Sequence, residues 1–248
     1  GFIAFFSSLA NQTTKLIFRV ERPFVQNPAL QPVEGARAGA TGYSFPSGHS
    51  TSATSLGMAL ILTFRKKWWI WLCSILYVAL ICFSRLYLGV HTPADVLTGF
   101  LMTVVVSLIV HALFNDSDKH PERKDLYLIL SMLLSLGALA WGLVVVSTGL
   151  APAELSVDIF KIAGAALGML IGVELDRHFV HFEVKAPLQM QIVKVVLGVL
   201  ITLGLRAGMK ALFGPAPMME FLRYLLTLLF ISIGWPALFN LAVKKFAK

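Results

Sequence analysis

The sequence predicts an all-α, polytopic membrane protein, and three observations lead to this fold class. Of the 248 residues, 57% are hydrophobic and only 14% are charged, and the mean hydropathy is +0.77. A soluble domain is closer to half apolar and a quarter charged. Long apolar runs recur along the whole chain, and Lys and Arg lie mainly between them. Helices are favoured over open sheets here, because in lipid a helix satisfies its own backbone hydrogen bonds.

About eight membrane segments are expected, the first of them partial. Residues 1–14 have the character of the end of a transmembrane helix, and we expect one or more further helices to precede Gly1. Ser47 or Ser50 would cap the second helix, and Pro93 suits the first turn of the fourth. The other helices are expected at about 50–64, 68–84, 93–114, 126–149, 158–174, 188–212 and 220–243.

Polarity divides the chain into three parts. Residues 1–114 combine apolar runs with a few strongly polar motifs. Residues 115–125 (NDSDKHPERKD) are the most polar stretch and predict a cytoplasmic linker. Residues 126–248 predict a four-helix transmembrane extension. In this extension Gly164, Gly168 and Gly172 recur every four residues, which is typical of close helix contact in membranes.

The distribution of cations predicts the orientation of the chain. The turns at 65–67, 115–125, 175–187 and 244–248 all contain Lys or Arg, whereas those at 86–92, 150–157 and 213–219 contain none. The positive-inside rule therefore places the first set in the cytoplasm. Helix parity then places the segments Lys15–His49 and Ser84–Asp95 together on the outer face, which would be the periplasmic face of a bacterial inner membrane.

Three cations in these outer segments predict a phosphate site. Lys15, Arg22 and Arg85 would donate to phosphoryl oxygens, which the Arg fork matches bidentately. Ser47 and Gly48 would add a hydroxyl and a backbone N–H at a helix start, where anions are favoured. The net charge of +8 is therefore better explained by lipid headgroups, phosphate substrates and membrane topology than by nucleic acid.

Two histidines and a carboxylate predict covalent chemistry at that site. A neutral His91 can attack phosphorus if one ring nitrogen is held by another group, and Asp95 lies one helical turn further on. A second histidine is then needed to protonate the departing oxygen, and His49 is the candidate. Such a reaction requires the two histidines to lie on opposite sides of the phosphorus.

Lys15-x6-Arg22-Pro23, Pro46-Ser47-Gly48-His49 and Ser84-Arg85-x5-His91-x3-Asp95 together resemble the three signature motifs of the type 2 phosphatidic acid phosphatase family, which the vanadium-dependent haloperoxidases share. The resemblance covers roughly residues 1–114. It implies a metal-independent phosphatase without a cofactor, in which His91 is the nucleophile, Asp95 orients it and His49 is the general acid. It also implies a phosphoryl-binding set of Lys15, Arg22, Ser47, Gly48 and Arg85.

The expected activity is removal of the terminal phosphate from a lipid phosphate or prenyl diphosphate, of the undecaprenyl diphosphate or phosphatidylglycerophosphate type. Three alternatives remain open: transfer of the phosphoryl group to an acceptor other than water, halide oxidation with bound vanadate, and a binder or transporter of phospholipids. The motifs leave the oligomeric state open.

A second polar cluster ends the predicted 158–174 helix. It contains Glu174, Asp176, Arg177, His178 and His181. Metal binding is one interpretation, but a solvated cytoplasmic turn is the simpler one.

Overall fold

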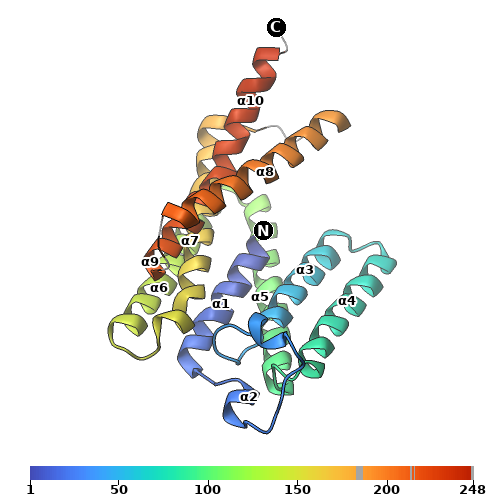
Figure 1. The fold of residues 1–248 in the computed structure, drawn as a ribbon. Helices are drawn as coiled ribbons and strands as arrows, with labels where there is room; N and C mark the ends of the chain where they lie inside the picture. Colours follow the sequence, from blue (N-terminus) through green and yellow to red (C-terminus); the bar gives the residue numbers. More distant parts are fainter. Residues whose placement is uncertain (183–186, 213, 215, 247–248) are drawn as a thin grey trace. The chain divides into compact units, whose positions relative to one another are not determined.

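Helices are the only regular secondary structure in the part of the chain that the structure describes, with no strand there, which confirms the predicted fold class (Figure 1). The computed structural model describes residues 1–182, 187–212, 214 and 216–246. Lys185 and Lys248, which contribute to the orientation prediction, lie outside these residues. The helices are α1 (Phe2–Phe18), α2 (Pro23–Gln26), α3 (Gly48–Thr63), α4 (Trp68–Tyr87), α5 (Pro93–Lys119), α6 (Lys124–Ser147), α7 (Ala153–Leu175), α8 (Leu188–Leu212), α9 (Pro217–Leu229) and α10 (Trp235–Phe246).

Six segments among the described residues are long and apolar enough to cross a membrane, so the chain is a multi-pass integral membrane protein. They are Trp68–Tyr87, Pro93–Lys119, Pro121–Ser147, Ala153–Val180, Leu188–Leu212 and Pro217–Asn240. The expected number of about eight was approximate, because α1 has 17 residues and α3 has 16. At a rise of about 1.5 Å per residue, both helices are shorter than the hydrocarbon core of about 30 Å.

The chain forms two compact units. The first contains Gly1–Ile129 and Ala138–Ile159, and the second contains Leu130–Gly137 and the chain from Phe160 onward. Within the first unit α3 packs against α1, α4 and α5, and α1 also packs against α5. Figure 1 shows α3 between α1 and α4. The three motifs that carry the predicted phosphate site all lie in this unit.

Helix α3 buries polar and small side chains and exposes apolar ones. Ser50, Thr51, Thr54 and Ser55 are almost completely buried, whereas the Leu56 side chain is 51% exposed. Some of these buried hydroxyls find hydrogen-bond partners within the helix itself, since the Ser55 hydroxyl donates to the Thr51 carbonyl at 2.8 Å. This inverted pattern suits a helix whose inner face carries a polar site and whose outer face contacts lipid.

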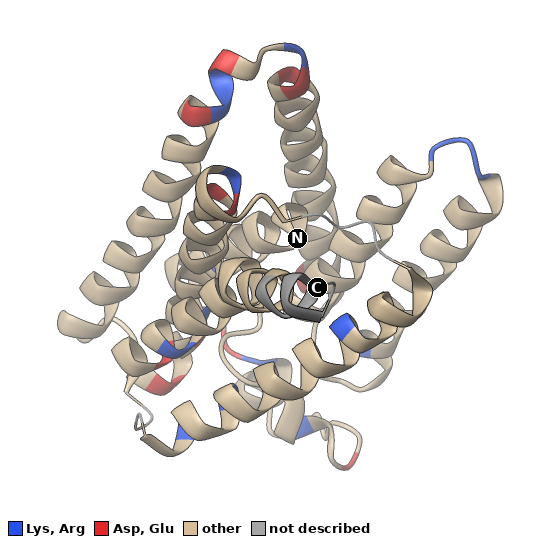
Figure 2. Cartoon of the chain, turned by 90° about the horizontal axis from the view of Figure 1, so that it is seen from above, with Lys and Arg blue, Asp and Glu red and all other residues tan. Residues whose placement is uncertain are grey.

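Half of the charged residues of this unit lie in two turns, 65–67 after α3 and 115–125 at the end of α5 (Figure 2). Helix α5 continues to Lys119, beyond its expected end near Phe114. The Asp116 carboxylate accepts two hydrogen bonds from Arg123 Nη1, at 3.0 and 3.2 Å, and a third from the Tyr127 hydroxyl. These contacts join the end of α5 to the start of α6, so the polar stretch is a compact helical turn.

The second unit shows the close helix contact expected from its glycines. A Cβ added at Gly164 would overlap the carbonyl of Phe221, and one at Gly168 would overlap the carbonyl of Leu225, both on α9. The predicted helix at 220–243 is divided into α9 and α10 by a π-helical segment, Phe230–Gly234. Ser232 in this segment donates to its own helix at the Leu228 carbonyl, 2.5 Å away.

Candidate active site

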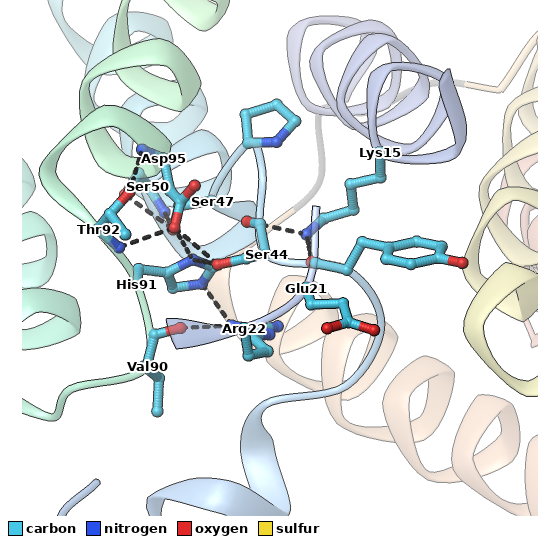
Figure 3. Close-up of polar contacts among 12 residues, drawn as sticks. Lys15, Glu21, Arg22, Ser44, Ser47, Ser50, Val90, His91, Thr92 and Asp95 are labelled. Carbon is cyan, nitrogen blue, oxygen red and sulfur yellow. Dashed lines mark hydrogen bonds and ion pairs between the residues drawn. The ribbon is translucent and has the colours of Figure 1, made fainter. Parts of the chain in front are cut away.

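Four segments of the first unit meet at one end of its helices: the end of α1, the loop before α3, the end of α4 and the start of α5. Backbone hydrogen bonds tie them together. Ser44 N–H donates to the Val20 carbonyl at 2.7 Å, and Ser47 N–H donates to the Asp95 carbonyl at 2.9 Å. The co-location predicted from helix parity is therefore present in the structure, and Figure 3 shows the side chains that converge there.

Asp95 both starts helix α5 and binds His91. Its Oδ2 accepts from Thr92 N–H at 2.7 Å, while Asp95 N–H donates to Thr92 Oγ1 at 3.2 Å, which is a complete capping box. The same Oδ2 lies 3.4 Å from His91 Nδ1 and accepts from the Ser44 hydroxyl at 2.7 Å. Three donors thus converge on one carboxylate oxygen and fix it beside the imidazole (Figure 3).

Arg22 determines which nitrogen of His91 carries the proton. Its Nη1 lies 2.8 Å from His91 Nε2. A guanidinium can only donate, so Nε2 must be the acceptor and the proton of a neutral ring must lie on Nδ1, facing Asp95. Nε2 therefore keeps a lone pair, which is the requirement for a nucleophile.

The Arg22 guanidinium is itself held by backbone carbonyls from two loops. It donates to Thr41 at 2.7 Å, to Gly42 at 3.2 Å and to Val90 at 3.1 Å, and the residue is 7% exposed. Burial lowers the pKa of Arg22 to about 10, so the side chain stays cationic at neutral pH. A fixed cation next to Nε2 is suited to holding a phosphoryl group at the nitrogen that would attack it.

Burial also determines the protonation of His91, which is 5% exposed. Burial lowers the pKa of His91 to about 4, and the charges of Arg22 and Lys15 act in the same direction against the opposing effect of Asp95. The ring is therefore neutral over the physiological range.

Lys15 and the Pro46–His49 motif provide further polar groups of the site. Lys15 Nζ donates to the carbonyls of Tyr43 and Ser44, the latter at 3.4 Å, and it is buried. Of the two predicted caps of α3, Ser47 is the one used, since its hydroxyl accepts from Ser50 N–H at 3.4 Å. Gly48 is then the first residue of the helix.

The structure brings Lys15, Arg22, Ser47, His91 and Asp95 together directly, whereas His49 and Arg85 are placed more loosely. His49 is exposed in the first turn of α3 and has no hydrogen-bond partner among the described residues. The positive charges that act on its ring are those of Arg85, Arg22 and Lys15. Arg85 lies in the last turn of α4, where its Nε donates to the Ser84 hydroxyl at 3.1 Å.

Three residues of the site were missed by sequence reasoning. Ser44 bridges His91 and Asp95, and Asn11 donates to the Pro46 carbonyl at 3.3 Å and to Thr51 Oγ1 at 3.0 Å. Gly99 allows α5 to approach the Ser47 backbone, because a Cβ there would lie 2.7 Å from the Ser47 carbonyl oxygen. Only their polar or small character within apolar or loop sequence marked these positions.

The second polar cluster lies in the other unit. Glu174 accepts from His178 Nε2 at 2.7 Å and pairs with Arg177 at 3.5 Å, and both partners are half exposed. No group of three or more His, Cys, Asp or Glu side chains in the described part of the chain could hold a metal ion. The contacts found are those of a solvated turn.

Comparison with known proteins assigns the family. The profile of the PAP2 superfamily matches residues 1–119, and that of the PAP2 superfamily phosphatase transmembrane extension matches residues 160–245. The chain belongs to the PAP2 superfamily. This membership confirms the resemblance carried by the three motifs, and it gives the second unit a family match that the motifs could not supply.

Several curated relatives of the chain carry phosphatase names. The chain is 35% identical to undecaprenyl-diphosphatase of Sulfolobus acidocaldarius over 40% of the chain and 45% of that protein. It is 28% identical to sphingosine-1-phosphate phosphatase 1 of Rattus norvegicus over 70% of the chain and 44% of that protein. It is 32% identical to lipid A 4'-phosphatase of Bacteroides thetaiotaomicron over 40% of the chain and 45% of that protein. The chain thus spans less than half the length of these relatives, and no solved structure matches it significantly.

Proposed function

We propose that this PAP2 chain is a metal-independent lipid phosphatase that removes a terminal phosphate through a phosphohistidine on His91. The arrangement of His91 between Asp95 and Arg22 carries this proposal. A ring whose Nδ1–H faces a carboxylate and whose Nε2 lies 2.8 Å from a fixed guanidinium is prepared for nucleophilic attack on an anion held by that guanidinium.

The reaction has two steps. In the first, Nε2 of His91 forms a bond to phosphorus as the bond to the leaving oxygen breaks, and His49 donates a proton to that oxygen. In the second, water attacks the phosphohistidine, His49 accepts its proton, and the bond from phosphorus to Nε2 breaks. Asp95 stabilises the positive charge that the ring acquires while phosphorylated.

The phosphoryl oxygens would be bound by Lys15, Arg22 and Arg85 together with Ser47 and the Gly48 backbone. Arg22 has two roles in this scheme. Before binding it donates to Nε2, and during attack it donates to a phosphoryl oxygen, so the contact that selects the tautomer gives way to the contact that stabilises the transition state.

The substrate class is a lipid phosphate or a prenyl diphosphate, with undecaprenyl diphosphate or phosphatidylglycerophosphate as the first choices. The names of the relatives, which include two undecaprenyl-diphosphatases, support a lipid-linked phosphate. The site lies at helix ends, so the lipid chain would remain in the bilayer while the phosphate reaches the cations.

The decisive experiment measures phosphate release by the detergent-purified protein in EDTA, across lipid phosphates and prenyl diphosphates, beside the His91→Gln variant. We expect release that survives EDTA and is lost in the variant, together with an acid-labile, base-stable phosphoryl label on the wild type. Phosphate release that is unchanged in His91→Gln would refute the mechanism.

The same experiment separates the alternatives. A phosphotransferase would give a phosphorylated acceptor in place of free phosphate when an alcohol acceptor is added. A vanadate-dependent haloperoxidase would oxidise halide with vanadate and peroxide. A binder or transporter would need Lys15 and Arg22 but would tolerate His91→Gln.

We further propose that the site faces the extracytoplasmic side of a bacterial inner membrane. The support is the cationic turn at 65–67, which lies at the opposite end of α3 from the site and contains no acidic residue (Figure 2). Single cysteines at Ala36 and Lys66, in a chain lacking Cys73 and Cys82, would test this in intact cells. An impermeant thiol reagent should label the first and not the second, and the reverse result would place the site in the cytoplasm.

A further inference from the structure

One exposed stripe of α3 begins at the proposed active site. His49, Ser52, Leu56 and Leu60 are all exposed, whereas Ala53, Thr54 and Gly57 between them are buried. Spacings of three and four residues place the exposed residues on one face of the helix. The two leucines are 51% and 37% exposed, although α3 packs against three other helices.

The composition of the stripe changes along its length. It is polar at His49 and Ser52 and apolar from Leu56 onward. From His49 to Leu60 the helix rises by about 16 Å at about 1.5 Å per residue. One leaflet of a hydrocarbon core of about 30 Å is about 15 Å thick. The stripe therefore has the length and the polarity gradient of one lipid molecule in a leaflet, with its polar end at the phosphate site.

The proposed chemistry predicts that the lipid chain follows this stripe from its polar end to its apolar end. His49 protonates the leaving oxygen, and the lipid chain is attached to that oxygen, directly or through a second phosphate. The chain must therefore leave the site past His49, and the surface that continues from His49 toward the middle of the bilayer is the Ser52–Leu60 part of α3.

We propose that this stripe, formed by His49, Ser52, Leu56 and Leu60, binds the hydrocarbon chain of the substrate and determines the preference of the enzyme for chain length. The inference rests on the proposed phosphatase activity and extends it to substrate selection. Ser52 would lie beside the polar linkage, and the leucines beside methylene groups further along the chain, which a short chain does not reach.

Helix α4 offers a matched control surface. Leu76 is 53% exposed, close to the 51% of Leu56, and it lies in the same unit. The strongly exposed residues Leu76, Leu80, Phe83 and Tyr87 form one stripe of α4. None of these four is a predicted site residue. If exposed apolar residues merely contact bulk lipid, substitutions at Leu56 and Leu76 should act alike.

The test compares Leu56→Trp with Leu76→Trp on short-chain and long-chain phosphates that carry the same headgroup. The larger indole would occupy the place of the chain without entering the buried core. We expect kcat/KM of Leu56→Trp to fall about tenfold for the long chain, as if about two methylene groups lost their contact, and to stay near wild type for the short chain. Leu76→Trp should leave both unchanged.

A second measurement does not depend on turnover. In the His91→Gln variant, a photoreactive amino acid at position 56 should crosslink to a radiolabelled long-chain lipid phosphate. An excess of unlabelled lipid phosphate should prevent this crosslink, whereas an excess of uncharged lipid should not. At Leu76 the same group should give crosslinks that excess lipid phosphate and excess uncharged lipid reduce to the same extent.

Equal losses for both chain lengths, equal effects at Leu56 and Leu76, or crosslinks from Leu56 to another copy of the protein would overturn the inference. Hydrolysis of short-chain phosphates by the wild type would still stand in those cases. Failure of the proposed function would instead appear as no phosphate release from any substrate.

Discussion

Replacing Gly99 with alanine would test how tightly helix α5 positions the phosphate-binding loop. An added Cβ would lie 2.7 Å from the Ser47 carbonyl oxygen, 3.3 Å from Ser47 N and 3.3 Å from Thr51 Oγ1. To restore an ordinary contact of at least 3.4 Å, the Ser47 carbonyl would have to move by about 0.7 Å (3.4 minus 2.7). The neighbouring Ser47 N–H donates to the Asp95 carbonyl, so the shift would also strain the link to α5.

The expected loss is larger in activity than in stability. Overpacking costs about 1–3 kcal/mol, and alanine in place of glycine in a helix returns about 1 kcal/mol, so the net destabilisation should be about 0–2 kcal/mol. A displacement approaching 1 Å at positioning groups can cost about a hundredfold in rate. We therefore expect kcat/KM to fall between about tenfold and a hundredfold while the protein remains folded.

Phosphate release and thermal unfolding in the same detergent would measure the two effects. Gly137→Ala is the control, because its added Cβ would meet no atom within 4 Å and it lies within helix α6. The control should keep full activity and gain slightly in Tm. If Gly99→Ala retained wild-type kcat/KM, the position of the Ser47 backbone would not matter for catalysis and the assignment of this loop would be wrong.

Three further predictions follow from contacts in the two units. Ser44→Ala removes a buried donor to the Asp95 carboxylate, so the free energy of unfolding should fall by about 1–3 kcal/mol and kcat by about tenfold; a wild-type Tm and kcat would contradict this. The His91 pKa is about 6.5 in the unfolded chain and about 4 in the folded one, so stability should be lost as pH falls between these values, by on the order of 3 kcal/mol; His91→Gln should flatten this dependence of Tm on pH, and an equal slope would refute it. Gly168→Val would force a side chain against the Leu225 backbone, so Tm should fall clearly, and an unchanged Tm would show that α7 and α9 do not touch there.

The sequence was informative where chemistry is local. The capping box and His91 lie within five consecutive residues, and Pro93 marks the start of α5, so that part of the site could be predicted directly. Helix α4 ends at Tyr87, later than the expected end at residue 84, because no helix breaker precedes Gly89. The positive φ of Gly89, 70°, is incompatible with a continuing α-helix.

Other features depend on contacts between distant residues and leave no local pattern. Ser44 and Asp95 are 51 positions apart, and Asn11 and Thr51 are 40 apart. A lone serine or asparagine in an apolar or loop segment gives no sign of its partner. The π-helical segment at Phe230–Gly234 could not be predicted either, because the hydrogen-bond pattern of a helix depends on neighbouring helices as well as on its own sequence.

The carboxylate of Asp95 links two equilibria, since one oxygen closes the first turn of α5 and also holds the imidazole. Whenever that turn frays, His91 loses its partner, so the fraction of catalytically competent molecules cannot exceed the fraction in which the turn is closed. Amide hydrogen exchange at Asp95 and Val96 would measure this opening directly. A phosphate analogue that favours the closed turn should slow that exchange, and the size of the slowing would give the coupling free energy between anion binding and the folding of a single helical turn.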